Sequence, residues 1–192
     1  PAKLLSLTPL IEVLEAEAKT AAADQAIPLA TLAAAMRADG LGIGWIHFRV
    51  NASQLHNALR RRIDPEGTLD LGSKSALSKL RELLAEVKPL RVNFGALAIE
   101  TSTAMRQFLV MAKMLQHIDA DAPIRMLIAE CEQPQTVLAA LYFARLFGIE
   151  DKVDVSPLFE TETALEHGGR FLEALLAEEA EADIFAVDAR DR

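Results

Sequence analysis

Cysteine is nearly absent from this chain, with one residue, Cys131, in 192. A single cysteine excludes an internal disulfide, and no signal-peptide pattern opens the sequence, so we expect a reducing, cytoplasmic location. No apolar run approaches the roughly 20 residues of a membrane span, and we expect no membrane partner. With 51% apolar residues, the chain is expected to fold around one core of its own as a single domain, 1–192.

Positive charge is also scarce. The sequence has 20 Lys and Arg against 28 Asp and Glu, for a formal net charge of −8. This balance argues against nucleic acid as a partner. It still allows an anionic small-molecule substrate, because a few arginines can dominate the field of a local pocket.

Several sequence signatures of catalysis and binding are missing. The chain has no nucleophile elbow, no Walker loop and no Cys/His spacing typical of zinc sites. The run GLGIG at 40–44 precedes a predicted strand rather than following one, so it is not a dinucleotide-binding fingerprint. Cys131 lies between two glutamates whose negative charge raises the pKa of its thiol, so it is a poor nucleophile.

What the sequence does contain is an alternation of short apolar runs and longer amphipathic patterns. Strands are predicted at 43–50, 90–99, 124–128 and 153–158, with a fifth candidate at Ile184. Helices are predicted at 4–22, 28–39, 54–62, 73–87, 101–116, 134–147 and 164–176, the last one interrupted at Gly168-Gly169. The alternation indicates an α/β fold built from parallel units: a helical lead-in (1–40), β/α units (41–176) and an acidic tail (177–192).

A closed barrel of parallel β/α units has eight strands. Four or five strands therefore predict either a small open sheet or a part of a TIM-type barrel whose remainder lies elsewhere. The first residue is Pro1 rather than methionine, and we expect the chain to be processed or to be a piece of a longer protein.

In a parallel sheet the carboxyl ends of the strands share one rim, where α/β proteins place their sites. The residues predicted there are Arg49, Asn51, Glu100, Glu130, Glu132 and Glu160. Carboxylates suit Mg²⁺ or Mn²⁺, and a guanidinium suits a carboxylate or phosphate ligand. Two other interpretations stay open: Glu160 caps the next helix with its charge, or Arg49 forms a structural salt bridge. Among the histidines, His47 is expected to be packed or paired in the core, and His56 to lie at the surface or to have its hydrogen bonds satisfied.

Two segments together resemble a known family. They are 128–139 (IAECEQPQTVLA) and 155–161 (VSPLFET), which are similar to Ile-Ser-Met-Ala-x-x-x-Ser-Asp-Val-Leu-Ala-Val and Pro-Leu-Phe-Glu-Thr in the barrel of bacterial phosphoenolpyruvate carboxylase. The spacing between them matches without a gap. Upstream, 46–53 (IHFRVNAS) is similar to the family's Leu-Asp-Ile-Arg-Gln-x-Ser. The resemblance covers about 41–176, and it departs from the family at Val50, at Ala129-Glu130 and at Thr136.

The resemblance implies conversion of phosphoenolpyruvate and bicarbonate to oxaloacetate and phosphate, with Mg²⁺ or Mn²⁺. It makes Glu160 a metal ligand and Arg49 an arginine on the phosphate side of the substrate. Asn51 and Glu130 are candidates through their place at the strand ends alone. It also implies a homo-oligomeric parent enzyme. The family's second metal carboxylate, glycine- and arginine-rich loop and catalytic histidine have no counterpart here, and Asp188 lies too close to Glu160 in sequence to supply that carboxylate.

We therefore expect part of a phosphoenolpyruvate carboxylase-like enzyme, a carboxy-lyase that is inactive as the isolated chain. Two alternatives remain. One is a non-catalytic α/β binding or scaffold module. The other is a different metal-dependent barrel lyase that acts on phosphoenolpyruvate or a keto acid.

Overall fold

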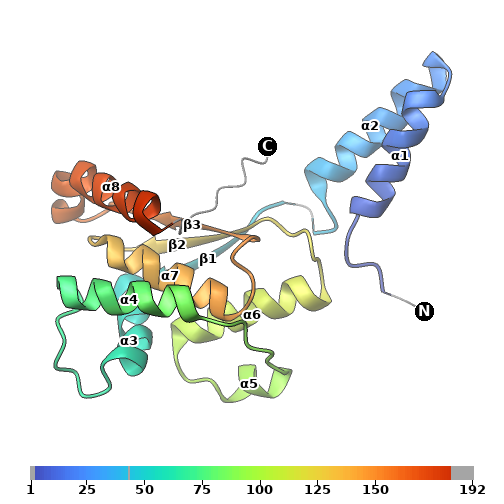
Figure 1. Cartoon of the computed structure of the whole chain (residues 1–192). Coiled ribbons are helices and arrows are strands. Elements are labelled where there is room, and N and C mark those ends of the chain that lie inside the picture. Colours follow the sequence, from blue (N-terminus) through green and yellow to red (C-terminus); the bar gives the residue numbers. More distant parts are fainter. Residues whose placement is uncertain (1–2, 43, 183–192) are drawn as a thin grey trace.

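The computed structural model describes residues 3–42 and 44–182 (Figure 1). Its elements in chain order are α1 (Thr8–Thr20), α2 (Ala23–Asp39), β1 (Ile46–Asn51), α3 (Ala52–Ile63), α4 (Lys74–Glu86), α5 (Phe94–Ile99), α6 (Thr103–His117), β2 (Ile124–Ala129), α7 (Pro134–Leu146), β3 (Val153–Pro157) and α8 (Glu162–Ala182). Each strand is followed directly by a helix, as the alternation in the sequence predicts.

The strands form one sheet in the order β1-β2-β3, and both pairings are parallel. Ile46 pairs with Ile124 and Ile124 pairs with Val153, so the three strands begin on one line. The predicted parallel arrangement is confirmed. Because the strands run in one direction, their carboxyl ends meet at a single edge of the sheet.

The strand predicted at 90–99 is wrong. Residues 94–99 form the short helix α5, and the side chain of Asn93 caps it by accepting a hydrogen bond from the backbone N–H of Ala96 at 3.0 Å. A short apolar run fits a strand and a buried helix equally well, and here the asparagine cap favours the helix. The sheet therefore has three strands among the described residues. The strand candidate at Ile184 lies outside them.

Two predicted helix features also differ. The second helix begins at Ala23, so Pro28 lies inside it rather than in its first turn. The last helix runs without interruption through Gly168-Gly169, from Glu162 to Ala182. Glycine costs only about 1 kcal/mol in a helix interior, which the surrounding helix-forming residues can offset.

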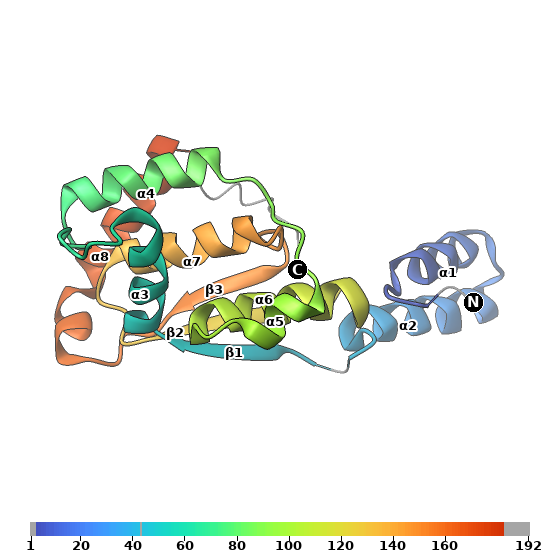
Figure 2. The same ribbon diagram turned by 90° about the horizontal axis from the view of Figure 1, so that it is seen from below.

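The core lies between one face of the sheet and the helices α3, α6 and α7 (Figure 2). On β2 the alternate residues Ile124, Met126 and Ile128 are at most 1% exposed, as expected for the inward face of a strand. Most of α7 is buried, and its Phe143 lies 5.6 Å from Phe108 of α6, measured between ring centroids. This buried layer fixes where the strand ends lie.

The other face of the sheet stays open in the described part of the chain. Its side chains are polar or partly exposed: His47 and Arg49 on β1, Arg125 and Leu127 on β2, and Asp154 and Ser156 on β3. The expectation that His47 is packed in the core is therefore wrong, because its position in the strand places it opposite the buried face.

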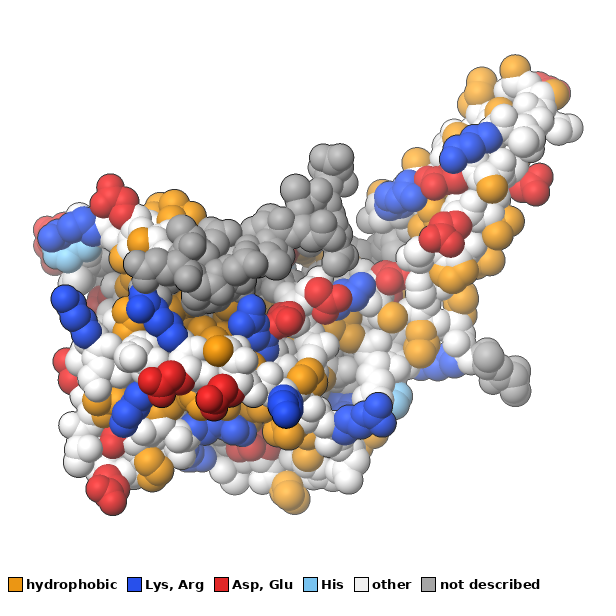
Figure 3. Space-filling view, in the orientation of Figure 1, with side chains coloured by type: hydrophobic (Ala, Val, Ile, Leu, Met, Phe, Trp, Pro, Cys, Tyr) orange, Lys and Arg blue, Asp and Glu red, His pale blue; other side chains and the backbone are white. Residues whose placement is uncertain are grey.

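Helices α1 and α2 pack on each other as a hairpin that extends away from this body (Figure 1). Its base is tied to the loop before β2, where Asp121 accepts hydrogen bonds from Ser6 and Thr8. Hydrophobic side chains lie along the exposed surface of the hairpin in the view of Figure 3. Within 3–42 and 44–182, no helix combines the length and apolar character needed to cross a lipid bilayer.

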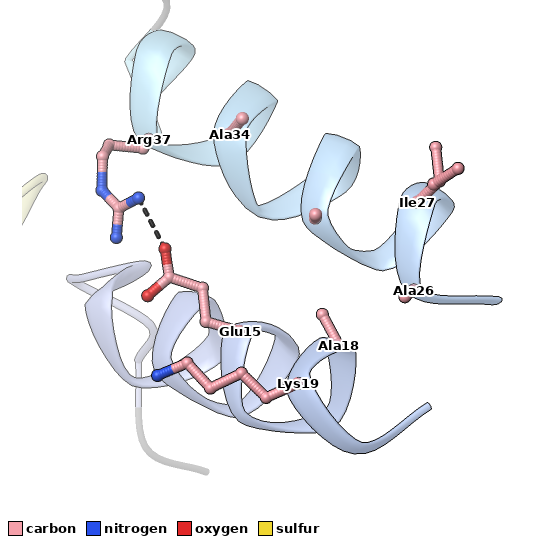
Figure 4. Close-up of a pocket in the computed structure, with 8 residues that line it drawn as sticks. Glu15, Ala18, Lys19, Ala26, Ile27, Ala34 and Arg37 are labelled. Carbon is pink, nitrogen blue, oxygen red and sulfur yellow. Dashed lines mark hydrogen bonds and ion pairs between the residues drawn. The ribbon is translucent and has the colours of Figure 1, made fainter. Parts of the chain in front are cut away.

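A shallow groove runs between α1 and α2, lined by small alanines and by the Glu15–Arg37 ion pair at 2.6 Å (Figure 4). It contains none of the residues predicted at the strand ends. The groove therefore plays no part in the candidate site.

Candidate functional site at the carboxyl edge of the sheet

Arg49 and Glu160 meet at the carboxyl edge of the sheet. The Nη2 atom of Arg49 lies 2.9 Å from Oε1 and 3.1 Å from Oε2 of Glu160. Arg49 is two residues before the end of β1, and Glu160 is three residues after the end of β3. Two residues that are 111 positions apart in sequence are thus joined by the parallel order of the sheet.

The backbone after β2 forms the third side of this site. The N–H group of Glu130 donates a hydrogen bond to Oε1 of Glu160 at 3.2 Å. Glu130 has a φ of 55°, in the left-handed region, and it is the non-glycine residue with positive φ in the described chain. Such a conformation costs on the order of 1 kcal/mol for a residue with a Cβ atom, so the surrounding contacts must hold it.

Asn51 connects the first two strands at this edge. Its Nδ2 atom donates to Oε2 of Glu130 at 2.6 Å. Its Oδ1 atom accepts a hydrogen bond from the backbone N–H of Ser53 at 2.9 Å. The backbone N–H of Asn51 donates to Oε1 of Gln54 at 3.1 Å, which completes a capping box for α3. Asn51 is therefore fixed as a helix cap and also holds the carboxylate of Glu130.

Thr161, rather than Glu160, caps the last helix. Its Oγ1 atom accepts a hydrogen bond from the backbone N–H of Ala164 at 3.1 Å and donates to Oε1 of Glu132 at 2.7 Å. The contacts of Glu160 go to Arg49 and Glu130 instead. Glu160 therefore does not cap α8 through a hydrogen bond, contrary to one of the two other interpretations.

Glu100 does not join these groups through a strand end, because no strand precedes it. Its Oε1 atom accepts from the backbone N–H of Ser102 at 2.7 Å, just before α6. The prediction that Glu100 lies at the rim depended on a strand at 90–99. Because residues 94–99 form α5 instead, the placement of Glu100 at the rim is also wrong.

The Arg49–Glu160 pair is only partly shielded from water. The Arg49 side chain is 58% exposed and that of Glu160 is 39% exposed. An ion pair this exposed contributes about 0–1 kcal/mol to stability. The backbone beneath it is held more firmly, since Gln107 of α6 donates to the carbonyl oxygen of Arg49 at 2.6 Å.

A buried polar cluster lies beneath the edge, on α3, α7 and the turn after β2. His56, expected to be a surface group or one with its hydrogen bonds satisfied, is half-buried, and its Nε2 atom lies 2.8 Å from Oγ1 of the fully buried Thr136. Burial lowers the pKa of His56, and the positive charge of Arg60 lowers it further. Burial, more than the neighbouring Glu132, raises the pKa of the Cys131 thiol to about 11, so this thiol is not a nucleophile at neutral pH.

The donor types at the edge suit Mg²⁺ or Mn²⁺, but their number falls short. The described residues contain no group of three or more His, Cys, Asp or Glu side chains placed to hold a metal ion. Both oxygens of Glu160 face Arg49, and the carboxylate of Glu130 is bound by Asn51. The described part of the chain therefore does not form a metal site by itself, and the carboxylate of Glu160 is paired with Arg49.

The chain matches the model of a known protein family over nearly its whole length. No curated protein and no solved structure matches the chain. The family model described as phosphoenolpyruvate carboxylase matches residues 4–189. This match includes every residue of the Arg49–Glu160 site and extends well beyond 41–176, so the chain belongs to the phosphoenolpyruvate carboxylase family.

Proposed function

We propose that this chain supplies Arg49 and Glu160 to a site that carboxylates phosphoenolpyruvate with bicarbonate, giving oxaloacetate and phosphate with the help of Mg²⁺ or Mn²⁺. Membership of the family supports a carboxylase of this class in general. The observation that carries the assignment to these residues is the Arg49–Glu160 contact at the carboxyl edge of the parallel sheet. Parallel β/α enzymes place their reacting groups at this edge.

Arg49 is suited to hold the phosphate side of the substrate. Its side chain is more exposed than buried, and it contacts Glu160 through Nη2. A guanidinium can present further N–H groups to a phosphate in a planar fork. Its role in the proposal is to bind and orient the group that leaves, which lowers the entropic part of the barrel enzyme's activation barrier.

Glu160 is suited to give one carboxylate to the metal. In the ion pair, the guanidinium occupies the side of Glu160 that a cation would approach, and the carboxylate occupies the side of Arg49 that a phosphate would approach. If a cation and a phosphate both bind, the Arg49–Glu160 contact would be replaced by two contacts, one between Glu160 and the cation and one between Arg49 and the phosphate. A divalent cation at Glu160 would stabilise negative charge on an oxygen of the substrate.

We also propose that the isolated 192-residue chain binds phosphoenolpyruvate without turning it over. The sequence has no counterpart of the family's second metal carboxylate or of its glycine- and arginine-rich loop. The sheet has three strands in the described residues, whereas a closed barrel has eight. In this proposal the chain is one segment of a TIM-type barrel in a cytoplasmic, homo-oligomeric enzyme that supplies the missing groups.

A non-catalytic α/β binding or scaffold module is the second candidate. The same ion pair favours it, because Arg49 and Glu160 neutralise each other without any ligand. In that case the pair would be a surface salt bridge of little energetic weight.

Calorimetric titration with phosphoenolpyruvate, with and without Mg²⁺, decides between the two. We expect binding that Mg²⁺ strengthens, that Arg49→Gln weakens about tenfold or more, and that the control Arg37→Gln leaves unchanged. Arg37 also forms an exposed ion pair, but on the hairpin. Absence of binding, or binding that does not depend on Arg49, would favour the scaffold module. A coupled assay for oxaloacetate tests turnover, and activity of the chain alone would contradict the proposed inactivity.

A further inference from the structure

Arg125 is an arginine on the open face of the sheet that the sequence pattern left without a role. It lies on β2 directly beside His47 of β1 and beside Asp154 of β3. Because side chains alternate along a strand, Arg125 projects to the side opposite the buried Ile124 and Met126. This is the same face from which Arg49 projects.

The guanidinium of Arg125 is held by its neighbours, but not all of its N–H groups have hydrogen-bond acceptors. It lies over the ring of Trp45, with Cζ 4.8 Å from the ring centroid. Its Nη2 atom is 4.0 Å from Oδ2 of Asp154, which is longer than a hydrogen bond. Its Nε atom is buried and has no hydrogen-bond partner. A buried donor without an acceptor is destabilising, so the guanidinium gains stability when it turns its N–H groups towards an anionic ligand.

Arg125 and Arg49 are close enough to act on one small molecule. Arg125 pairs with His47, and Arg49 is two residues further along β1. With strands about 4.8 Å apart and a rise of about 3.3 Å per residue, their Cα atoms are separated by about 8 Å. Two arginine side chains on one face at this separation can reach the two ends of a ligand that carries two anionic groups.

We propose that Arg125 is a second substrate-binding arginine of this site and that it holds the carboxylate end of phosphoenolpyruvate while Arg49 holds the phosphate end. The inference rests on the proposed function, because it assigns the other end of the same substrate. Arg125 lies further from the carboxyl edge of the sheet than Arg49 does. The substrate would thus lie along the open face, with its phosphate towards Glu160 and the rim.

The chain has a reporter for this binding mode, since Trp45 is its single tryptophan. An anion that draws the Arg125 guanidinium away from the Trp45 ring changes the tryptophan emission. Titrations with phosphoenolpyruvate and with inorganic phosphate, read by calorimetry and by this emission, separate the two ends of the substrate. The variants are Arg125→Gln, Arg125→Lys and Arg49→Gln, with Arg37→Gln as the ion-paired control.

We expect Arg125→Gln to weaken phosphoenolpyruvate binding about tenfold and to leave phosphate binding unchanged. The phosphoenolpyruvate affinity of Arg125→Lys should lie between those of the unmodified chain and Arg125→Gln, because lysine keeps the charge but lacks the planar fork of N–H groups. Arg49→Gln should weaken the binding of both ligands.

Unchanged phosphoenolpyruvate affinity in Arg125→Gln overturns the inference, and so does an equal loss of affinity for both ligands. If Arg125→Gln weakens binding while Arg49→Gln does not, the role of Arg125 stands and the assignment of Arg49 falls. Absence of phosphoenolpyruvate binding to the unmodified chain overturns both.

Discussion

The backbone N–H of Glu130 donates to the same Oε1 atom of Glu160 that Arg49 approaches, at 3.2 Å and 2.9 Å respectively. The carboxylate of Glu160 is thus oriented by one charged side chain and by one backbone group. The backbone group belongs to a residue in the left-handed conformation, with a φ of 55°. The site therefore combines an exposed ion pair with a local backbone conformation that costs stability.

This conformation predicts an order of stability for two substitutions at position 130. Glu130→Gly and Glu130→Ala both remove the side-chain contact with Asn51, so the loss of this contact does not contribute to the difference in stability between the two variants. Glycine adopts a φ of 55° without a Cβ penalty, and the Glu130→Gly variant should be more stable by about 1 kcal/mol. Urea unfolding of the two variants measures the difference. Equal stabilities would show that the surrounding contacts impose no strain at Glu130.

The pKa of His56 predicts a loss of stability in mildly acidic solution. Its pKa is lowered from 6.5 by burial and by Arg60, so the unfolded chain binds a proton more readily than the folded chain does. The free energy of unfolding should then fall as the pH drops below about 6.5 and level off below the folded pKa, as far as this group is concerned. His56→Gln keeps a group that can bond to Thr136 but does not titrate, and it should flatten the slope in this window. An identical slope in both proteins would assign the effect to other groups.

The strands that carry the site could be predicted from the sequence because their signals are local. The apolar runs that contain Arg49 and that precede Glu130 and Glu160 are bounded by helix-start signals, and the parallel order follows from the β/α alternation. The run at 90–99 has the same local signal and folds as a loop and helix instead. The helix cap at Asn93 and the packing of this segment in the fold, rather than its apolar content, decide that it forms a helix.

The partners within the site could not be predicted in the same way. The bond between Asn51 and Glu130 depends on the register of two strands that are far apart in sequence. The left-handed conformation of Glu130 has no signature in the sequence, since glutamate rarely adopts it. Arg125 did leave a signal: it alternates with buried Ile124 and Met126, which places it on the other face of its strand. Only the register shows that this is the face of Arg49.

Cys131 should be unreactive in the folded chain. It is fully buried, and its thiol has a pKa of about 11, so at pH 8 about one molecule in a thousand carries the thiolate. We expect a disulfide reagent such as Ellman's to label it slowly in native buffer, and rapidly once urea unfolds the chain. The reagent consumption of Cys131→Ser gives the background. Rapid stoichiometric labelling of the native chain would mean that α7 opens readily around this residue.

Glu160→Gln separates metal binding from structure at the candidate site. Glutamine keeps an oxygen that can accept from Glu130 and Arg49 but removes the negative charge. Because the ion pair is exposed, the free energy of unfolding should fall by about 1 kcal/mol or less. Without Mg²⁺, phosphoenolpyruvate should bind the variant at least as tightly as the unmodified chain, since Arg49 no longer faces a competing anion. The strengthening by Mg²⁺ should be lost, because the carboxylate proposed to hold the cation is gone. Glu150→Gln, which breaks a partly exposed ion pair with Arg145 elsewhere, serves as the control. Full Mg²⁺ strengthening in Glu160→Gln would remove Glu160 from the metal site and leave the Arg49 pair as a structural salt bridge.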